Sequence, residues 1–142
     1  MRKTEEFDTL QIFADGGSRG NPGPSGVGVV LLGKKGEKVE EISKYIGNAT
    51  NNVAEYLAVI YGLQEAAYRK TRKVILNVDS QLVAKQLKGE YRVKDQNIQK
   101  FFDLALNLFR IFDKVEIREI SREENKDADA LVNKAINLKA LL

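Results

Sequence analysis

The chain contains no cysteine and no histidine among its 142 residues. Without these side chains it cannot form a Ser-His-Asp or Cys-His nucleophile system, a thiol redox pair, or a zinc site with the usual nitrogen and sulfur ligands. Any catalysis must therefore use carboxylates, lysines, hydroxyls or a hard metal ion bound through oxygen atoms.

Long apolar runs are missing as well. No segment approaches the roughly 18 apolar residues that a membrane-spanning helix needs. The opening sequence MRKTEEFDTL has acids where a signal peptide has its apolar region. No repeat, low-complexity tract or proline-rich linker divides the chain. We therefore expect a single domain, residues 1–142, that is cytoplasmic, makes no membrane contact and is by default a monomer.

Charge is nearly balanced overall but uneven along the chain. Hydrophobic residues make up 43% and charged residues 30% of the sequence, as in ordinary globular domains. The net charge is +3, yet residues 69–100 carry nine Lys or Arg against three Asp or Glu, a local net charge of +6. This segment is either a surface that faces a polyanion or a set of solvated helix faces.

Hydrophobic spacing predicts an α/β fold in which three strands precede the first helix. Short apolar runs separated by glycine and proline are typical of strands, whereas residues 53–69 form a run that is too long for a strand and rich in helix formers. The spacing predicts strands at 10–14, 27–32, 38–46, 74–78 and 115–120, and helices at 53–69, 80–88, 95–112 and from 125 to the C-terminus.

A glycine-rich stretch follows the first predicted strand, with six glycines in the thirteen residues after Asp15. Residues 28–35 match the phosphate-loop pattern G-x-x-x-x-G-K, but Lys35 stands where Ser or Thr should bind magnesium. No helix begins there to direct amide groups at a phosphate. A plain β connection is the alternative, but a carboxylate at a strand end, beside residues that let another backbone approach, favours a ligand site.

Three further carboxylates stand at unusual positions. Glu55 is the only charged residue in the apolar run 53–61, where burying an unpaired carboxylate is costly. Asp79 ends the strand VILNV as Asp15 ends the first strand, and Asp129 lies between alanines in NKDADAL. Each acid thus stands where another element can approach it closely.

Each acid also has an ordinary structural explanation. Glu55 could complete a capping box with Asn52 as the N-cap. Asp79 or Ser80 could cap the next helix, and Asp129 could be a solvent-exposed helix acid. Together, however, these acids indicate one cluster, which would repel itself unless cations were present. Two Mg²⁺ or Mn²⁺ ions about 4 Å apart would activate a water and stabilise the leaving oxygen of a phosphodiester.

Four motifs occur in order along the chain: DGGSRGNPG at 15–23, TNNVAEY at 50–56, VDSQLV at 78–83 and NKDADAL at 125–131. Together they resemble the motifs of type 1 ribonuclease H. The resemblance implies one ribonuclease H domain with its core at about 9–137. It also implies a three-layer α/β fold, in which helices flank a five-stranded mixed sheet of three antiparallel and then two parallel strands.

The resemblance further implies an activity, the hydrolysis of the RNA strand of RNA·DNA hybrids by two Mg²⁺ or Mn²⁺ ions, leaving 5′-phosphate and 3′-hydroxyl ends. By motif position the catalytic, metal-binding carboxylates would be Asp15, Glu55, Asp79 and Asp129. The positions that resemble the family's hybrid-binding residues are Gly16, Ser18, Asn21, Asn51, Asn52 and Gln81. By the same resemblance Thr50 would contact a phosphate of the DNA strand. Short polar groups and bare backbone suit contacts with 2′-hydroxyls in a wide, shallow minor groove.

Two departures from the family pattern stand out. Many members place a histidine in the loop before the last helix, where this chain has Arg122, Glu123 and Glu124. We expect Arg122 to take part of that role through a phosphate contact. We do not expect it to act as an acid or base, because a guanidinium does not deprotonate. Residues 88–95 lack the basic insertion of some relatives, so we expect looser, more salt-sensitive binding. The alternatives are a non-catalytic nucleic-acid-binding relative and a nuclease of the same fold that also cuts double-stranded RNA.

Overall fold

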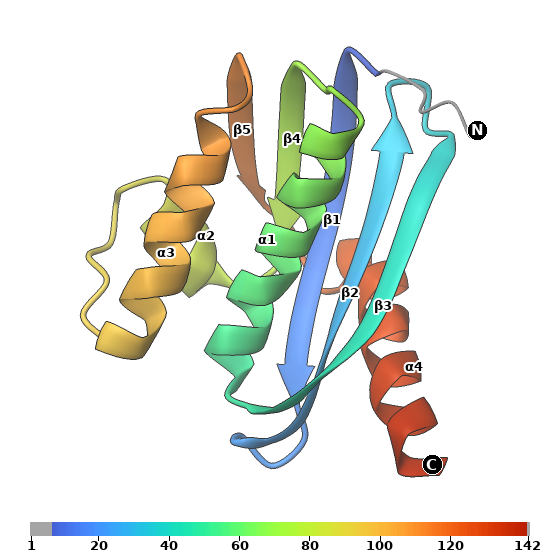
Figure 1. The fold of residues 1–142 in the computed structure, drawn as a ribbon, viewed down its shortest axis with the longest axis vertical. Helices are drawn as coiled ribbons and strands as arrows, with labels where there is room; N and C mark the ends of the chain where they lie inside the picture. The colour runs from blue at the N-terminus through green and yellow to red at the C-terminus, as the bar shows by residue number, and fades with distance from the viewer. Residues whose placement is uncertain (1–6, 142) are drawn as a thin grey trace.

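The structure, a computed structural model, describes residues 7–141 (Figure 1). Residues 1–6, which belong to the opening segment that lacks a signal peptide's apolar region, lie outside the described residues, as does residue 142. No helix in the described part is long and apolar enough to cross a membrane. The elements are β1 (Thr9–Ser18), β2 (Gly23–Gly33), β3 (Lys38–Ala49), α1 (Asn51–Tyr68), β4 (Lys73–Val78), α2 (Gln81–Leu87), α3 (Gln96–Phe109), β5 (Lys114–Glu119), the 3-10 turn η1 (Glu123–Asn125) and α4 (Lys126–Leu141).

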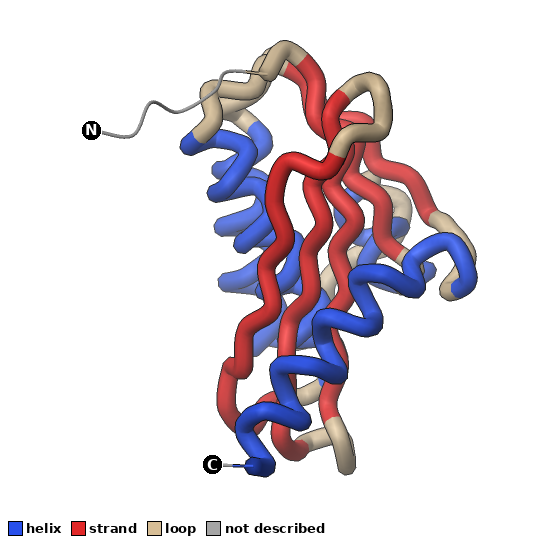
Figure 2. The backbone as a smooth tube through the Cα atoms, turned by 90° about the vertical axis from the view of Figure 1, so that its right-hand side faces the viewer, coloured by secondary structure: helices blue, strands red, loops and turns tan. Residues whose placement is uncertain are grey.

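Five strands form one mixed sheet in the order β3-β2-β1-β4-β5. β1 pairs antiparallel with β2, and β2 with β3. β4 pairs parallel with β1 and with β5. Helices α1, α2 and α3 cover one face of the sheet, and α4 covers the other (Figures 1 and 2). The predicted three-layer α/β fold, with three antiparallel strands and then two parallel ones, is confirmed.

Every predicted strand and helix is present, and the differences lie at their ends. β1, predicted over 10–14, continues through Asp15 to Ser18, and β2, predicted from 27, begins at Gly23, because the glycine-rich residues between the two predicted strands pair with each other in the sheet. The helix predicted over 95–112 ends at Phe109, and Phe112 packs into the core from the turn that follows. The helix predicted from 125 begins at Lys126, after η1. Boundaries of this kind depend on capping and tertiary contacts more than on hydrophobic spacing.

The main core lies between the sheet and α1. Alternate residues of β1, namely Leu10, Ile12 and Ala14, are buried on one face, as the two-residue period of a strand requires. Helix α1 is apolar almost all round because it packs against β1 and β2 on one side and α3 on another. The prediction of a buried first helix is therefore confirmed.

Two glycines let helices touch the sheet backbone directly. A Cβ on Gly16 would overlap the backbone carbonyl group of Ala54 in α1. A Cβ on Gly28 would overlap the backbone carbonyl oxygen of Ala128 in α4. Neither position accepts a side chain unless a helix backbone moves. Gly16 and Gly28 therefore set how closely α1 and α4 approach the sheet, one on each face.

Replacing Gly28 by alanine should destabilise the fold, because the added methyl group would push α4 away from β2. We expect Gly28→Ala to lower the free energy of unfolding by about 2 kcal/mol or more in urea titrations followed by circular dichroism. Gly17→Ala is the matched control, since a Cβ there would meet Val132 Cγ1 at an ordinary 3.5 Å. Equal losses in the two variants would contradict the role given to Gly28.

Candidate active site

Asp15 and Asp79 each come directly after the last residue that is paired between β1 and β4. β1 and β4 run parallel and are paired up to Ala14 and Val78, the residues just before the two aspartates. β4 ends there, whereas β1 continues in its pairing with β2. The carboxyl ends of parallel strands are where α/β sheets bind ligands. The strand order therefore brings both aspartates to such a place.

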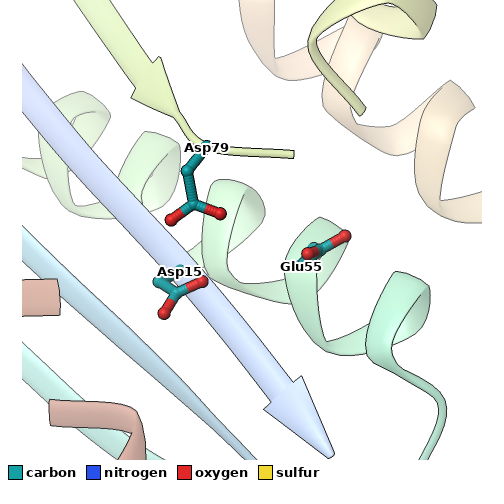
Figure 3. A group of neighbouring side chains, drawn as sticks. All are labelled: Asp15, Glu55 and Asp79. Carbon is teal, nitrogen blue, oxygen red and sulfur yellow. The ribbon is translucent and has the colours of Figure 1, made fainter. Parts of the chain in front are cut away.

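Glu55 reaches these aspartates from α1. Because Gly16 has no side chain, the α1 backbone at Ala54 and Glu55 lies directly against β1. Carboxylate oxygens of Asp15, Glu55 and Asp79 lie within 4.8 Å of one another (Figure 3). All three side chains are half-buried, and within residues 7–141 they are the one group of acids close enough together to hold a metal ion.

The ordinary structural explanations for Glu55 and Asp79 are wrong. Thr50, and not Asn52, caps α1, because its Oγ1 accepts a hydrogen bond at 3.3 Å from an amide of the first turn. Ser80 caps α2 in the same way, at 3.2 Å. Neither carboxylate is therefore used to cap a helix, and both face the cluster.

Asp129 lies beside this cluster, on α4, the helix that covers the face of the sheet opposite α1. It lies in the first turn of α4, is exposed to solvent, and is outside the group of three carboxylates. Asn133, one turn further along α4, donates to the Asp129 carboxylate at 3.4 Å. The negative charge of Asp129 still acts on Asp15, whose pKa it helps to raise. The expected fourth carboxylate is thus within electrostatic reach of the other three.

Burial, together with nearby negative charge, raises the pKa values of Asp15 and Glu55. Burial raises the pKa of Asp15 to about 8, and the negative charges of Asp79 and Asp129 add to the effect. Burial likewise raises the pKa of Glu55 to about 7. Near neutral pH the cluster therefore binds protons that a divalent cation would displace.

Asn125 holds Asp79 in place, and the sequence reasoning gave it no role. Its Nδ2 donates to Asp79 Oδ2 at 2.8 Å and to the backbone oxygen of Ala14 at 2.9 Å. The side chain is 1% exposed and bridges the ends of β1 and β4. Helical spacing could have indicated it, because Asn125 shares a face with buried Ala128 and Val132, and a polar group on a buried face needs partners.

Three of the expected substrate residues form one connected group at the end of β1. Asn51 Oδ1 accepts a hydrogen bond from the Ser18 amide at 2.8 Å, and Asn21 Oδ1 accepts one from the Asn51 amide at 3.0 Å. These bonds tie the β1–β2 turn to the start of α1, next to the cap residue Thr50. Asn52 follows on α1 with an exposed side chain.

The remaining expected substrate residues differ in how they can reach a ligand. Gln81, the first residue of α2, is exposed. Arg122 is also exposed, and its positive charge favours the ionised form of Glu55. Gly16 is buried beneath α1, so only its backbone could touch a ligand. A bulky residue at position 16 would therefore disturb the packing of α1 as well as the site.

The fold and site define a mixed-sheet α/β domain with a carboxylate cluster suited to hard metal ions. Known proteins resemble this chain in sequence. The family model described as "Reverse transcriptase-like" matches residues 13–135. The chain is 43% identical over 128 residues to "Ribonuclease HI" of Halobacterium salinarum, an alignment that covers 90% of this chain and 64% of that relative. It is 31% identical to "Ribonuclease H" of Pseudomonas fluorescens, covering 94% of each chain.

Solved structures agree with these sequence matches. RNase H1 from Halobacterium salinarum has a TM-score of 0.89 at 42% identity, covering 91% of this chain and 98% of that one. LC11-RNase H1, solved in complex with an RNA/DNA hybrid, has a TM-score of 0.88 at 39% identity and covers 94% and 99% of the two chains. The chain belongs to the type 1 ribonuclease H family. It spans 64% of the length of the Halobacterium relative and 36% of the length of a bifunctional Mycobacterium tuberculosis protein.

The carboxylate cluster should make the metal-free protein less stable as the pH rises. The pKa values of Asp15, about 8, and Glu55, about 7, lie above those of an unfolded chain, so the folded state binds more protons over this range. Stability from these groups is complete at acidic pH and is lost as the pH passes through the folded pKa values. In chelator we expect a loss of more than about 1 kcal/mol between about pH 5 and pH 9.

Urea titrations of the wild type and Asp15→Asn across this pH range measure the effect. The difference in unfolding free energy between the two proteins should grow as the pH rises, with Asp15→Asn the more stable at high pH. Asp103→Asn, which removes an exposed acid of α3, is the control and should follow the wild type. A difference between wild type and Asp15→Asn that stays constant with pH would contradict the expectation.

Proposed function

We propose that the protein is a metal-dependent endoribonuclease that hydrolyses the RNA strand of RNA·DNA hybrids and leaves 5′-phosphate and 3′-hydroxyl ends. The observation that carries this proposal is the meeting of Asp15, Glu55 and Asp79 within 4.8 Å, with Asp129 at the rim. A structural relative bound to an RNA/DNA hybrid supports the choice of substrate. We further propose that the protein acts in the cytoplasm as a monomer.

The donor set fits two Mg²⁺ or Mn²⁺ ions. Carboxylate oxygens are the ligands these ions prefer. Burial and the neighbouring acids raise the pKa values of Asp15 and Glu55, and a bound divalent cation would favour their ionised forms. Asp15, Glu55 and Asp79 would hold the ions, and Asp129 would complete the set. Bound there, two divalent ions would supply an activated water and a stabilised leaving oxygen at the scissile phosphate.

Other side chains would position the reacting groups. Asn125 donates a hydrogen bond to Asp79 Oδ2 at 2.8 Å, which fixes the orientation of the carboxylate. The second carboxylate oxygen of Asp79 would then bind a ligand. Arg122, whose charge reaches Glu55, would contact the phosphate near the scissile bond. Its guanidinium would stabilise negative charge and would not move a proton.

The connected polar residues at the end of β1 would recognise the sugars and the helical shape of the hybrid. Ser18, Asn21 and Asn51 are fixed by mutual hydrogen bonds, so little order is lost when they meet a ligand. Short side chains of this kind can contact 2′-hydroxyls in the minor groove, where sequence is hardly read. Thr50 and the exposed side chains of Asn52 and Gln81 would extend this surface along both strands.

The basic segment would receive the DNA strand. A hollow of about 520 Å³ begins at Asn52 and is lined by Tyr91, Arg92 and Lys94 from the segment that precedes α3. The Lys85 ammonium lies 5.1 Å from the centre of the Tyr91 ring and helps to fix it. Glu90 and Asp95 also line this hollow and offset its two cations. Phosphates should therefore bind there more weakly than to a larger basic insertion, and binding should weaken as salt is added.

Cleavage assays on labelled RNA·DNA, RNA·RNA and DNA·DNA duplexes test the proposed function. With Mg²⁺ or Mn²⁺ we expect cuts in the RNA strand of the hybrid alone, and none in chelator. Asp79→Asn should lower the rate by at least about 100-fold, because it removes a charged metal ligand. Cleavage of RNA·RNA as well would indicate the broader nuclease. Binding without cleavage would indicate the non-catalytic relative, and activity in chelator would refute metal dependence.

Arg122→Ala should lower kcat on the hybrid by about 10-fold, the loss of one charge-assisted phosphate contact. Arg110→Ala, which removes an exposed cation at the end of α3, is the control and should leave kcat unchanged. Arg122→Lys should restore part of the rate, since it keeps the charge without the planar guanidinium. Unchanged kinetics in Arg122→Ala would rule out the contact.

A further inference from the structure

Gln86, in the last turn of α2, is a buried polar residue without a role in the cleavage reaction described above. Its side chain is 6% exposed. It lines the hollow of about 520 Å³ that begins at Asn52 and is bordered by the segment that precedes α3. Buried polar groups are unfavourable unless their donors and acceptors have partners. The two ends of the Gln86 amide differ in this respect.

Tyr56 fixes the oxygen end of this amide. The Tyr56 side chain is fully buried in α1, and its hydroxyl donates to Gln86 Oε1 at 2.7 Å. A buried tyrosine hydroxyl usually has such a partner. Because both side chains are buried and the bond is short, the amide is held in one orientation, with Oε1 toward Tyr56 and Nε2 away from it.

The nitrogen end, Nε2, is a donor without a partner that solvent can reach. Among residues 7–141 nothing accepts a hydrogen bond from it. Thr71 Oγ1 and Asn125 Oδ1 are the described side-chain atoms that lack a partner and are closed to water, and Gln86 Nε2 is not one of them. Nε2 is therefore accessible, and the hollow is the cavity that Gln86 lines. An acceptor that enters the hollow would satisfy this donor.

The surroundings of the hollow favour a phosphate oxygen as that acceptor. Arg92 and Lys94 bring two positive charges, and Glu90 and Asp95 bring two negative ones. Asp95 is also the N-cap of α3, where its Oδ1 accepts a backbone amide at 2.8 Å. Where charges are balanced in this way, a neutral donor such as Gln86 contributes a large share of the attraction for a phosphate. Most hydrogen bonds between proteins and DNA go to phosphates and sugars.

The hollow lies beside the carboxylate cluster. Asn52, where the hollow begins, and Glu55, which belongs to the cluster, are three residues apart in α1. Residues at this spacing are neighbours on a helix surface, with Cβ atoms about 5–6 Å apart. A duplex whose RNA strand lies on the cluster would therefore bring its DNA strand close to the hollow.

We propose that Gln86 is a substrate-binding residue whose Nε2 donates to a phosphate oxygen of the DNA strand, and that Tyr56 is the positioning residue that orients it. The inference rests on the proposed function, because it needs a hybrid bound with its RNA strand on the carboxylate cluster. The contact would fix the DNA strand along its own length. Through base pairing it would also fix which RNA phosphate lies on the cluster.

The double variant Tyr56→Phe/Gln86→Met removes the donor and leaves no buried group unpaired, because both partners of the hydrogen bond become apolar. In steady-state cleavage of a hybrid with Mg²⁺ we expect KM to rise about 5-fold or more, with kcat within about 2-fold of the wild type. Tyr56→Phe alone keeps the donor but releases its orientation, so KM should rise by less. Gln64→Met, at an exposed position further along α1, is the control and should leave KM unchanged.

Gln86→Glu is a second test in case the double variant does not unfold cooperatively in urea. Glutamate keeps an acceptor for the Tyr56 hydroxyl, but in place of Nε2 it has an oxygen that repels phosphate. We expect KM to rise about 10-fold or more. Gln64→Glu places the same charge on the exposed part of α1 and should keep the KM of the wild type.

Methylphosphonate substitution locates the contact. Each phosphate of the DNA strand is replaced in turn by an uncharged methylphosphonate, while the RNA strand stays intact and its cuts are mapped. In the wild type, one replacement at a fixed distance from a cut should lower kcat/KM for that cut by about 10-fold. In Tyr56→Phe/Gln86→Met the same replacement should have an effect at least about 3-fold smaller, because the donor is already missing. Effects at the other phosphates should be unchanged.

The outcomes separate this inference from the proposed function. A wild type that cuts no hybrid would refute both. A wild type that cuts the hybrid, together with unchanged KM in the double variant and in Gln86→Glu, would overturn the role of Gln86 and leave the proposed function standing. The same conclusion would follow if every methylphosphonate had an equal effect in the wild type and in the double variant.

Discussion

Direct contact between helix backbone and sheet backbone is the constraint on which the active site depends. Gly16 places α1 against β1, and Gly28 places α4 against β2. Each of these helices carries one carboxylate, Glu55 or Asp129, toward the aspartate of β1. Metal ligands must hold their distances to within about 0.2 Å, a tolerance smaller than the shift that one inserted methyl group would force. Gly16 and Gly28 therefore serve packing, and not a phosphate loop.

Close packing of this kind brings acids together before any cation is present. The raised pKa values of Asp15 and Glu55 measure the cost, because each acid is partly removed from water beside other negative charges. Compensation is only partial. Asn125 donates a hydrogen bond to Asp79, and Glu55 is favoured in its ionised form by a hydrogen bond with Ser80 and by the charge of Arg122. The fold thus gives up stability at the carboxylate cluster, where a divalent cation would relieve the repulsion.

Sequence reasoning recovered what depends on local pattern. Strand and helix positions follow from apolar spacing, and Asp79 was found because a strand end can be read from that spacing. The prediction that Asp15 also ends a strand was wrong, because β1 continues past it to Ser18 in its pairing with β2. The sequence did not predict the N-cap of α1, because several neighbouring residues were equally suitable for that position. Thr50, Asn51 and Asn52 can all cap a helix, and the choice is made by long-range bonds from Asn51 to the β1–β2 turn. Asn125 was missed for a similar reason, because its partners lie on two strands distant in sequence.

The loop before α4 shows how this chain manages without a histidine. Ser121 and Glu124 cap each other's backbone amides, at 3.1 and 3.2 Å, and these hydrogen bonds lower the pKa of Glu124. Glu124 is therefore held ionised in a structural role, and Glu123 is fully exposed beside Lys126. Of the three charged residues in the loop, Arg122 is the one whose charge reaches the carboxylates. The loop thus offers the site a fixed positive charge in place of a group that exchanges protons near neutral pH.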